Sequence, residues 1–566
     1  MMLGLDYFCE QVPEGKYCSV PMRVLPEEVA ELIQETGLGG AVLFASNFQS
    51  LAQSTQLTYD LQQASLTSLD PKPFLIAVDQ EGGRVVRLPR HLGTSFSGNM
   101  AIGATYSSKG TYYAQQVGKV LGQELEAVGI NVNFAPTLDV NYNPENPVIN
   151  IRSFGSDPTM VGNLGVAMVR SIQESSVAAA VKHFPGHGDT AVDSHTGLPM
   201  VDRPIEELLE RDLKPFQMVI EQAAPAMVMT AHIQYPQIDS STLIGLDGEA
   251  VIRPATMSKA ILTDLLRSEM GYDGIIVTDA LTMKGISNFF DPVQAVVETF
   301  NAGSDIALMP FLVNSPDDIP AFKLFIRAVA KQLEGTDLGQ FERSMARIDN
   351  IRSNHQVKDI AVQLAEAKAV VGKEAHRIVE WQLANHAITM VKNNAQLPWI
   401  DDQVQKVQLL VDDPVQGKLI KQALLQYWPM RNTKPPEIEV RLWQELQQLT
   451  QLPATNSAWL AVVDHGYRSP VIEKGESPMS LEDKLSLLDF LKKDRASQPL
   501  VLVAMQSPYD LMGHLDDVDA AVAAYHSIIY ESPEDQHLGI SYQAIAAMIT
   551  GINEQGGHLP VCFGSE

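Results

Sequence analysis

Cysteine is scarce in this sequence. Only Cys9, Cys18 and Cys562 occur among 566 residues. An odd and sparse set of this kind argues against a disulfide framework, and without a CxxC pair it offers no cysteine-bound zinc or redox site. The first ten residues, MMLGLDYFCE, also lack the basic start and sustained apolar run of a secretory signal. We therefore expect a cytoplasmic protein.

Long apolar runs and excess positive charge are missing as well. No segment reaches the run of about 18 apolar residues that a membrane-spanning helix requires. Acidic residues outnumber basic ones by 68 to 41, which gives a formal net charge of −27. Such a charge disfavours nucleic acid and anionic membrane surfaces as partners, because both are polyanions.

What remains is the composition of an ordinary globular protein, with 45% hydrophobic and 19% charged residues. A chain of 566 residues is too long for a single hydrophobic core, so we expect two domains. We place a first domain with a helical connector at 1–355 and a second at 356–566.

Short apolar runs alternate with longer amphipathic stretches in the first part of the chain. Continuous runs such as FLIAV and GIIVT suit strands that are buried on both faces, which is typical of parallel sheets. The amphipathic stretches 112–128 and 205–222 are predicted helices. The predicted strands are 40–45, 74–78, 132–135, 178–181, 226–230, 274–278 and 305–309.

Polar side chains follow several of these strands. Asp79, the pair Lys182 and His183, His232 and Asp279 each come directly or almost directly after an apolar run. Functional groups at the carboxyl ends of many strands are typical of a (β/α) barrel, whereas a doubly wound sheet concentrates them at one switch point. We therefore predict an α/β fold with an N-terminal TIM-type (β/α) barrel, irregular because we find seven strands.

A second alternating pattern follows a mostly helical stretch at 312–384. Its predicted strands are 388–391, 407–411, 438–442, 458–463 and 500–504. This pattern predicts a separate C-terminal α/β layer domain.

The segment 181–195, VKHFPGHGDTAVDSH, holds an unusual density of ionisable groups after a buried strand. Burial of so many charges would be costly in a core, which favours an active-site edge. Asp193 precedes His195 by two residues, so its carboxylate can hold the imidazole and raise its pKa toward that of a general acid. The alternative is that Asp193 caps a turn and His195 is merely exposed.

Three further positions carry two interpretations each. Asp279 can act as a nucleophile or base at a strand end, or as a helix N-cap. In DQEGGRVVR, Arg84 or Arg87 can reach a pocket, or an Arg–Glu pair can brace the turn. Arg152, in a loop rich in Pro and Asn, can grip a hydroxyl or carbonyl, or form a surface ion pair.

Histidines could instead bind a metal ion. The candidates are His183, His187, His195 and His232. A metal-dependent barrel hydrolase usually begins with an HxH pair after its first strand, and here Ser46-Asn47-Phe48 occupies that place. We predict no metal ion.

Five motifs, in order, resemble those of glycoside hydrolase family three, and in particular of its β-N-acetylglucosaminidase branch. They are DQEGGRVVR, NFAPTLDV, KHFPGHGDTAVDSH, MTAHI and GIIVTDALTM, and they span Asp79 to Met283. The C-terminal half resembles the α/β sandwich domain of two-domain members. The resemblance therefore implies a barrel followed by an α/β sandwich.

The resemblance also implies roles. Asp279 matches the nucleophile, and His195 matches the acid/base that is paired with Asp193. The residues that match positions holding the hydroxyls of the terminal sugar are Asp79, Arg87, Arg152, Lys182 and His183.

The implied reaction is exo-hydrolysis of a terminal β-linked N-acetylglucosamine with retention, without metal or organic cofactor. The alternatives are an N-acetylglucosaminide phosphorylase, a β-glucosidase or β-xylosidase of the same family, and a non-catalytic sugar-binding module. A GlcNAc-terminated oligosaccharide, a muropeptide and a glycoconjugate all offer the same terminal sugar, and the oligomeric state cannot be read from the sequence.

Overall fold

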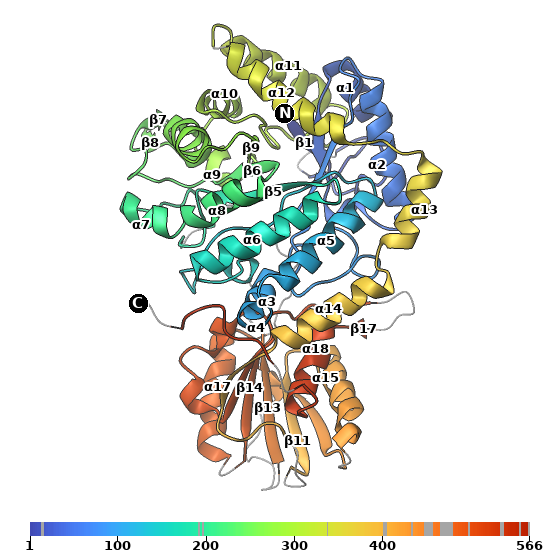
Figure 1. The fold of residues 1–566 in the computed structure, drawn as a ribbon, viewed down its shortest axis with the longest axis vertical. Coiled ribbons are helices and arrows are strands. Elements are labelled where there is room, and N and C mark those ends of the chain that lie inside the picture. The colour runs from blue at the N-terminus through green and yellow to red at the C-terminus, as the bar shows by residue number, and fades with distance from the viewer. Residues whose placement is uncertain are drawn as a thin grey trace.

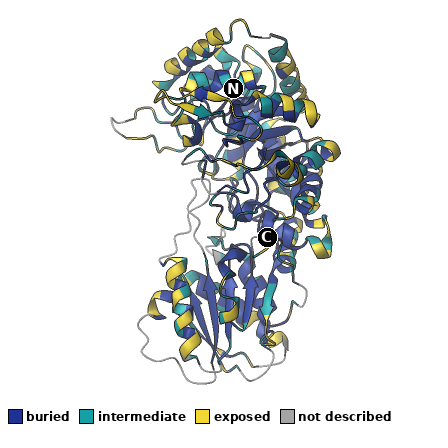
Figure 2. Cartoon of the chain, turned by 90° about the vertical axis from the view of Figure 1, so that its left-hand side faces the viewer, coloured by how far each residue is buried: buried dark blue, intermediate teal, exposed yellow. Residues whose placement is uncertain are grey.

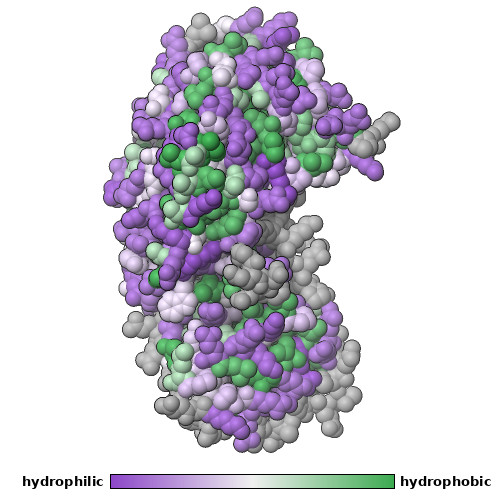
Figure 3. Space-filling model, turned by 90° about the vertical axis from the view of Figure 1, so that its right-hand side faces the viewer, coloured by the Kyte–Doolittle hydropathy of each residue, from purple (hydrophilic) through white to green (hydrophobic). Residues whose placement is uncertain are grey.

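The chain forms two α/β parts, one above the other in Figure 1, each built around its own sheet. In Figure 2 the central strands of both parts are mostly buried, and many exposed residues lie on the helices. On the face in Figure 3 hydrophilic side chains predominate. The computed structural model describes residues 1–12, 16–190, 193–194, 197–336, 338–399, 404–431, 434–446, 457–464, 479–495, 498–531, 537–553 and 556–563.

The first sheet is a parallel barrel. Its hydrogen-bonded order is β1 (Met2–Gly4), β2 (Gly40–Val42), β3 (Leu75–Val78), β4 (Val132–Asn133), β5 (Ala178–Phe184), β6 (Met227–Thr230) and β9 (Ile275–Thr278). Parallel bridges from Ile306 to Val277 and from Leu308 to Met2 close the ring. The predicted fold class is confirmed, and the strand missing from the prediction is β1.

Alternation along the strands separates two buried layers. Side chains such as Leu75, Ala77 and Val277 meet in the cluster that fills the barrel. Their neighbours Ile76 and Ile276 belong to the larger cluster beneath the surrounding helices. Because successive side chains point to opposite faces of a strand, both layers require apolar residues, and this produces the continuous apolar runs in the sequence.

Helices surround the barrel (Figure 1). They are α1 (Glu27–Thr36), α2 (Leu51–Leu66), α5 (Tyr112–Ala127), α6 (Pro158–Gln173), α8 (Leu213–Ala223), the π-helix η4 (Ala260–Glu269), α10 (Pro292–Ala302) and α11 (Asp318–Gln332). Asp157 and Asp291 cap α6 and α10, and a proline follows each cap in the first turn. The helix predicted at 205–222 is divided into α7 (Ile205–Glu210) and α8.

The second sheet has the order β10–β15–β14–β13–β11–β12 and is parallel except for β10. Its strands are β10 (Thr389–Asn393), β11 (Lys406–Val411), β12 (Glu437–Leu442), β13 (Ser457–Val463), β14 (Leu500–Ala504) and β15 (Ala520–Ala523). Leu460 packs with α15 (Pro414–Tyr427) and α18 (Ile540–Ile549), and its neighbour Trp459 joins the cluster that includes α17 (Leu481–Asp494). Helices therefore cover both faces, which confirms the predicted α/β sandwich.

Three helices link the two sheets: α12 (Leu338–Asn354), α13 (Ile360–Val370) and α14 (Glu374–Ala387). The helix α13 packs against α2 and α5 of the barrel, and α14 contacts both α3 (Asn99–Ala104) and α18. The connection is thus packed on both parts, and the domain boundary at 355/356 stays a prediction.

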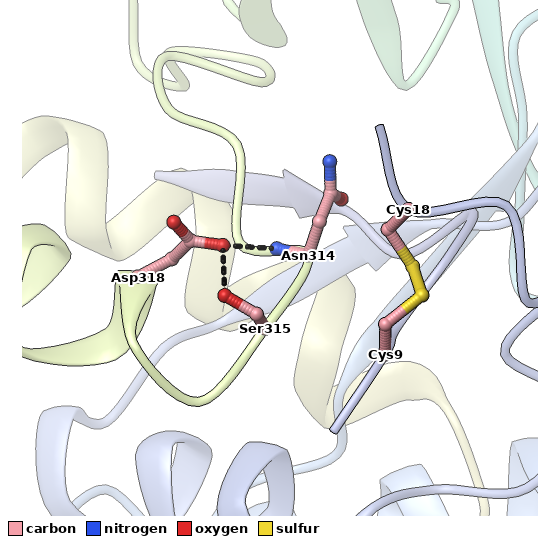
Figure 4. Close-up of a disulfide and its surroundings, with 5 residues drawn as sticks. All are labelled: Cys9, Cys18, Asn314, Ser315 and Asp318. Carbon is pink, nitrogen blue, oxygen red and sulfur yellow. Dashed lines mark hydrogen bonds between the residues drawn. A yellow bond between two sulfur atoms is a disulfide. The ribbon is translucent and has the colours of Figure 1, made fainter. Parts of the chain in front are cut away.

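A disulfide joins Cys9 and Cys18 in the loop after β1 (Figure 4). We expected no disulfide framework from three cysteines, but an odd total does not prevent one pair nine residues apart from meeting. The backbone N–H of Cys9 donates to the carbonyl of Asn314 at 2.9 Å, and the Asp318 carboxylate in α11 accepts from Asn314 at 3.0 Å. Disulfides are typical of oxidising compartments, so this one lends no support to a cytoplasmic location.

Among the described residues, no helix combines the length and the apolar character that crossing a bilayer demands.

Candidate active site

A cavity of about 480 Å³ opens where the barrel strands end at their carboxyl termini. Six of the eight residues that we predicted for the site line it: Asp79, Arg87, Arg152, Lys182, His183 and Asp279. They come from four segments of the chain, and the parallel barrel brings these segments to one face. The arrangement of the apolar strands therefore gathers the polar groups.

Asp79 stands directly after β3 and faces two cations. Its carboxylate accepts from the Lys182 ammonium at 2.8 Å and from the Arg87 guanidinium at 3.3 Å. Burial alone would raise the pKa of Asp79, but the charges of Lys182 and Arg87 outweigh it and hold the pKa below its usual range. Asp79 is therefore an ionised hydrogen-bond acceptor that faces the cavity.

Glu81 belongs to the same charge network, although we did not predict it as a site residue. Its carboxylate accepts from the Arg152 guanidinium at 2.7 and 2.9 Å and from the Lys182 ammonium at 2.7 Å. The three side chains are at most 5% exposed. Arg152 thus forms a buried ion pair rather than the surface pair that was our alternative.

His183 is held by Asp139, a second residue that we did not predict for the site. Both Lys182 and His183 belong to β5, which runs on to Phe184 with a register shift, so they lie in the strand and not after it as we expected. Asp139 accepts from the His183 Nδ1 at 2.8 Å and from the backbone N–H groups of His183 and His187 at 3.1 and 2.7 Å. This fixes the His183 ring by Nδ1, so Nε2 is the atom that can meet a ligand.

Asp279 follows β9 and is partly exposed. Its Oδ1 accepts from the backbone N–H of Ala280 at 2.7 Å. The helix-cap alternative does not hold, because the next helix, α9 (Lys284–Ser287), has Met283 at its N-cap. His232 faces the Ala280 carbonyl through Nε2 at 3.0 Å, so it supports the backbone that carries Asp279.

The predicted acid/base segment, which carries Asp193 and His195, is described only in part. His195 itself lies outside the described residues. Asp193 and Ser194 are buried, and Asp193 is not among the described residues that line the cavity. The Ser194 carbonyl accepts from the backbone N–H of Gly285 in α9 at 3.1 Å. A Cβ at Gly285 would lie 2.8 Å from the carbonyl oxygens of Ser194 and Gly197. The described part of the segment thus packs against the loop after Asp279.

Both ring nitrogens of His187 are engaged by hydroxyls of the described residues, unlike the Nε2 of His183. The His187 ring contacts the hydroxyls of Thr190 and Ser194 at 2.7 and 3.0 Å. Burial lowers the pKa of His187 to about 4, so this ring is neutral at pH 7. Within the described part of the chain, no three His, Cys, Asp or Glu side chains are grouped so that they could hold a metal ion.

Comparisons with known proteins agree with the geometry. Residues 16–351 match the family model described as the N-terminal domain of glycosyl hydrolase family 3. The chain is 41% identical to Beta-hexosaminidase A of Pseudoalteromonas piscicida, over 99% of this chain and 95% of that protein. It is 35% identical to the Beta-hexosaminidase of Bordetella avium (strain 197N), over 52% of this chain and 78% of that one.

A solved structure is similar over both domains. The glycoside hydrolase family 3 beta-N-acetylglucosaminidase from Paenibacillus sp. str. FPU-7 superposes with a TM-score of 0.76 at 27% identity. The alignment covers 100% of this chain and 98% of the other.

Proposed function

The chain belongs to glycosyl hydrolase family 3, and on that premise we propose that it is a retaining exo-β-N-acetylhexosaminidase that removes terminal N-acetylglucosamine. One observation carries the proposal. A single cavity at the carboxyl face of the barrel contains Asp279 together with the buried charge network of Asp79, Lys182 and Arg152. Similarity to Beta-hexosaminidase A over nearly the whole chain supports the substrate class.

Asp279 is the proposed nucleophile. Retaining glycosidases form a covalent glycosyl-enzyme when a carboxylate attacks the anomeric carbon. The backbone N–H of Ala280 orients the carboxylate, and His232 holds that backbone in turn. Asp279 therefore meets the sugar from a rigid strand end.

His195 is the proposed acid/base, assisted by Asp193. A protonated imidazole would donate its proton to the leaving oxygen, and the neutral ring would then take a proton from the attacking water. The packing of Ser194 against Gly285 supports this role, because it keeps the segment beside the loop after Asp279.

The buried charges bind the sugar without titrating near neutral pH. Burial alone would lower the pKa of Lys182, but Asp79 and Glu81 raise it, and Lys182 and Arg87 lower the pKa of Asp79. These groups stay ionised across the neutral range. We therefore expect Asp79 and Lys182 to contribute no pH dependence to turnover near neutrality.

Replacement of the nucleophile tests the proposal directly. Asp279→Asn should lower kcat on an aryl β-N-acetylglucosaminide by roughly 10⁴-fold or more while thermal unfolding stays unchanged. The matched control is Asp291→Asn, which alters the cap of α10 and should leave turnover intact. Full activity of Asp279→Asn would remove the assignment.

Leaving-group dependence tests His195. His195→Ala should reduce turnover of substrates with poor leaving groups far more than that of activated aryl glycosides, because only the former need the proton. An equal loss on both would contradict the acid role.

Comparison of an aryl glucoside with an aryl N-acetylglucosaminide tests the substrate class, since the proposal requires preference for the latter.

A further inference from the structure

We propose that the second domain positions the active site by holding one barrel loop, residues 141–156, through Ser507 and Tyr509. This inference rests on the proposed function, because the loop carries Arg152 and supports the acid/base segment. Ser507 and Tyr509 are not among the described residues that line the cavity, and they act through Asn150 and Asn141, so they are positioning residues.

Two buried hydrogen bonds cross between the domains. The Ser507 hydroxyl donates to the Asn150 side-chain carbonyl at 3.0 Å, and the Asn141 amide donates to the Tyr509 hydroxyl at 3.0 Å. Ser507 and Asn141 are 0% exposed, and the other two partners are below 10%. Because buried polar groups without partners are costly, each bond fixes its two partners relative to one another.

The C-terminal segment holds the far end of the same loop. The backbone N–H of Ser156 donates to the Pro560 carbonyl at 3.0 Å. A Cβ at Gly155 would lie 2.3 Å from that carbonyl oxygen, so only glycine allows this approach. The loop is therefore fastened to the second domain at its beginning, middle and end.

The first half of the loop supports the acid/base segment. The Asn143 amide donates to the Thr190 carbonyl at 3.2 Å, and the Asn146 amide donates to the His187 carbonyl at 2.9 Å. Thr190 lies three residues before Asp193. A shift of Asn141 would therefore move the loop that holds His187 and Thr190, and with them the chain that leads to Asp193.

The second half of the loop carries Arg152. It contains the 3-10 turn η2 (Asn150–Arg152), in which Asn150 has a φ of +39°. This left-handed conformation is uncommon for residues with a side chain, although asparagine tolerates it better than most, and a contact with the surroundings helps to hold it. Ser507 supplies such a hold two residues before Arg152.

The two contacts should therefore have different kinetic effects. Ser507→Ala loosens the turn that carries Arg152, so KM should rise about 5-fold with a small change in kcat. Tyr509→Phe loosens the beginning of the loop, so kcat on a substrate with a poor leaving group should fall about 5-fold while an activated substrate is spared.

Matched variants separate positioning from loss of stability. Tyr525→Phe is the control, because Tyr525 is also buried but its hydroxyl donates to Thr389 within the second domain. Ser507→Thr keeps the hydroxyl and should restore most of the KM. Kinetics of Ser507→Ala and Tyr509→Phe that equal those of Tyr525→Phe would overturn the proposal.

A second measurement does not depend on the substrate. Hydrogen exchange of the full-length protein should show faster exchange of peptides covering 141–156 and 187–190 in Ser507→Ala and Tyr509→Phe, but not in Tyr525→Phe. If the wild type lacks turnover of N-acetylglucosaminides, the proposed function fails, whereas unchanged exchange in these peptides refutes the positioning role by itself.

Discussion

Glu81→Gln removes a buried negative charge that faces two buried cations. The Glu81 carboxylate contacts Arg152 at 2.7 and 2.9 Å and Lys182 at 2.7 Å, and all three side chains are at most 5% exposed. Loss of one partner from a buried ion pair costs about 3–5 kcal/mol, because the other charge stays desolvated. Glutamine keeps an acceptor oxygen, so we expect about 3 kcal/mol. At about 2 °C per kcal/mol for a large domain, the apparent Tm should fall by about 6 °C.

The same variant should weaken substrate binding. Arg152 and Lys182 line the cavity, and Glu81 holds both in place. We expect KM to rise about 10-fold, which corresponds to about 1.4 kcal/mol of binding free energy. Steady-state kinetics with an aryl N-acetylglucosaminide measures this change.

The difference in stability between wild type and Glu81→Gln should depend on pH. Burial alone would raise the pKa of Glu81, but Arg152 and Lys182 hold it far below the ordinary 4.5. A carboxyl group with a lowered folded-state pKa contributes its full stability above its unfolded-state pKa and loses it as the pH falls. The Tm difference should therefore be largest above about pH 5 and shrink toward about pH 3.

Asp305→Asn is the matched control. Asp305 is also buried and paired with two arginines, Arg267 and Arg347, but it contacts the amino end of β9, away from the cavity. The Asp305→Asn variant should lower the Tm by an amount similar to that of Glu81→Gln and leave KM unchanged. If Glu81→Gln costs less than about 1 kcal/mol with an unaltered KM, or if the Tm difference grows as the pH falls, the reasoning is wrong.

Two further substitutions test the supports of the site. Asp139→Asn replaces one of two carboxylate oxygens, of which Oδ2 accepts from the His183 ring and Oδ1 from the His183 backbone N–H, so kcat/KM should fall about 10- to 100-fold, and kinetics equal to wild type would contradict this role. Gly285→Ala places a Cβ 2.8 Å from the Ser194 carbonyl, so it should lower kcat on substrates with poor leaving groups. Ser287→Ala, at an exposed position of the same short helix, should not, and equal losses in both would rule out the packing argument.

The sequence predicted the sheets well because buried parallel strands leave continuous apolar runs. The runs at 74–78 and 274–278 became β3 and β9 almost unchanged. The strand β1 is only three residues long and ends in a glycine, and β15 is made of three alanines and one valine. Neither has the length or the β-branched content that marks a strand.

The polar supports of the site could not be predicted in the same way. Glu81 was assigned to a turn, because its partners Arg152 and Lys182 lie 71 and 101 residues further along the chain and only the barrel brings them together. Asp139 lies inside a motif that we quoted, but its bond to His183 depends on the same closure. Position along a strand predicts which residues reach the cavity, whereas the partners of a charge follow from the topology.

The bridges of Met2 and Val277 to the segment 306–308 have a consequence for synthesis of the protein. Until residue 308 leaves the ribosome, β1 and β9 are the two open edges of a curved sheet, each with unpaired backbone groups ready to bind another chain. The first strand of the barrel, β1, therefore has no partner on one side until the segment 306–308 is available. A nascent chain or proteolytic fragment that ends before residue 306 is expected to need a chaperone, even though it already contains Asp79 and Asp279.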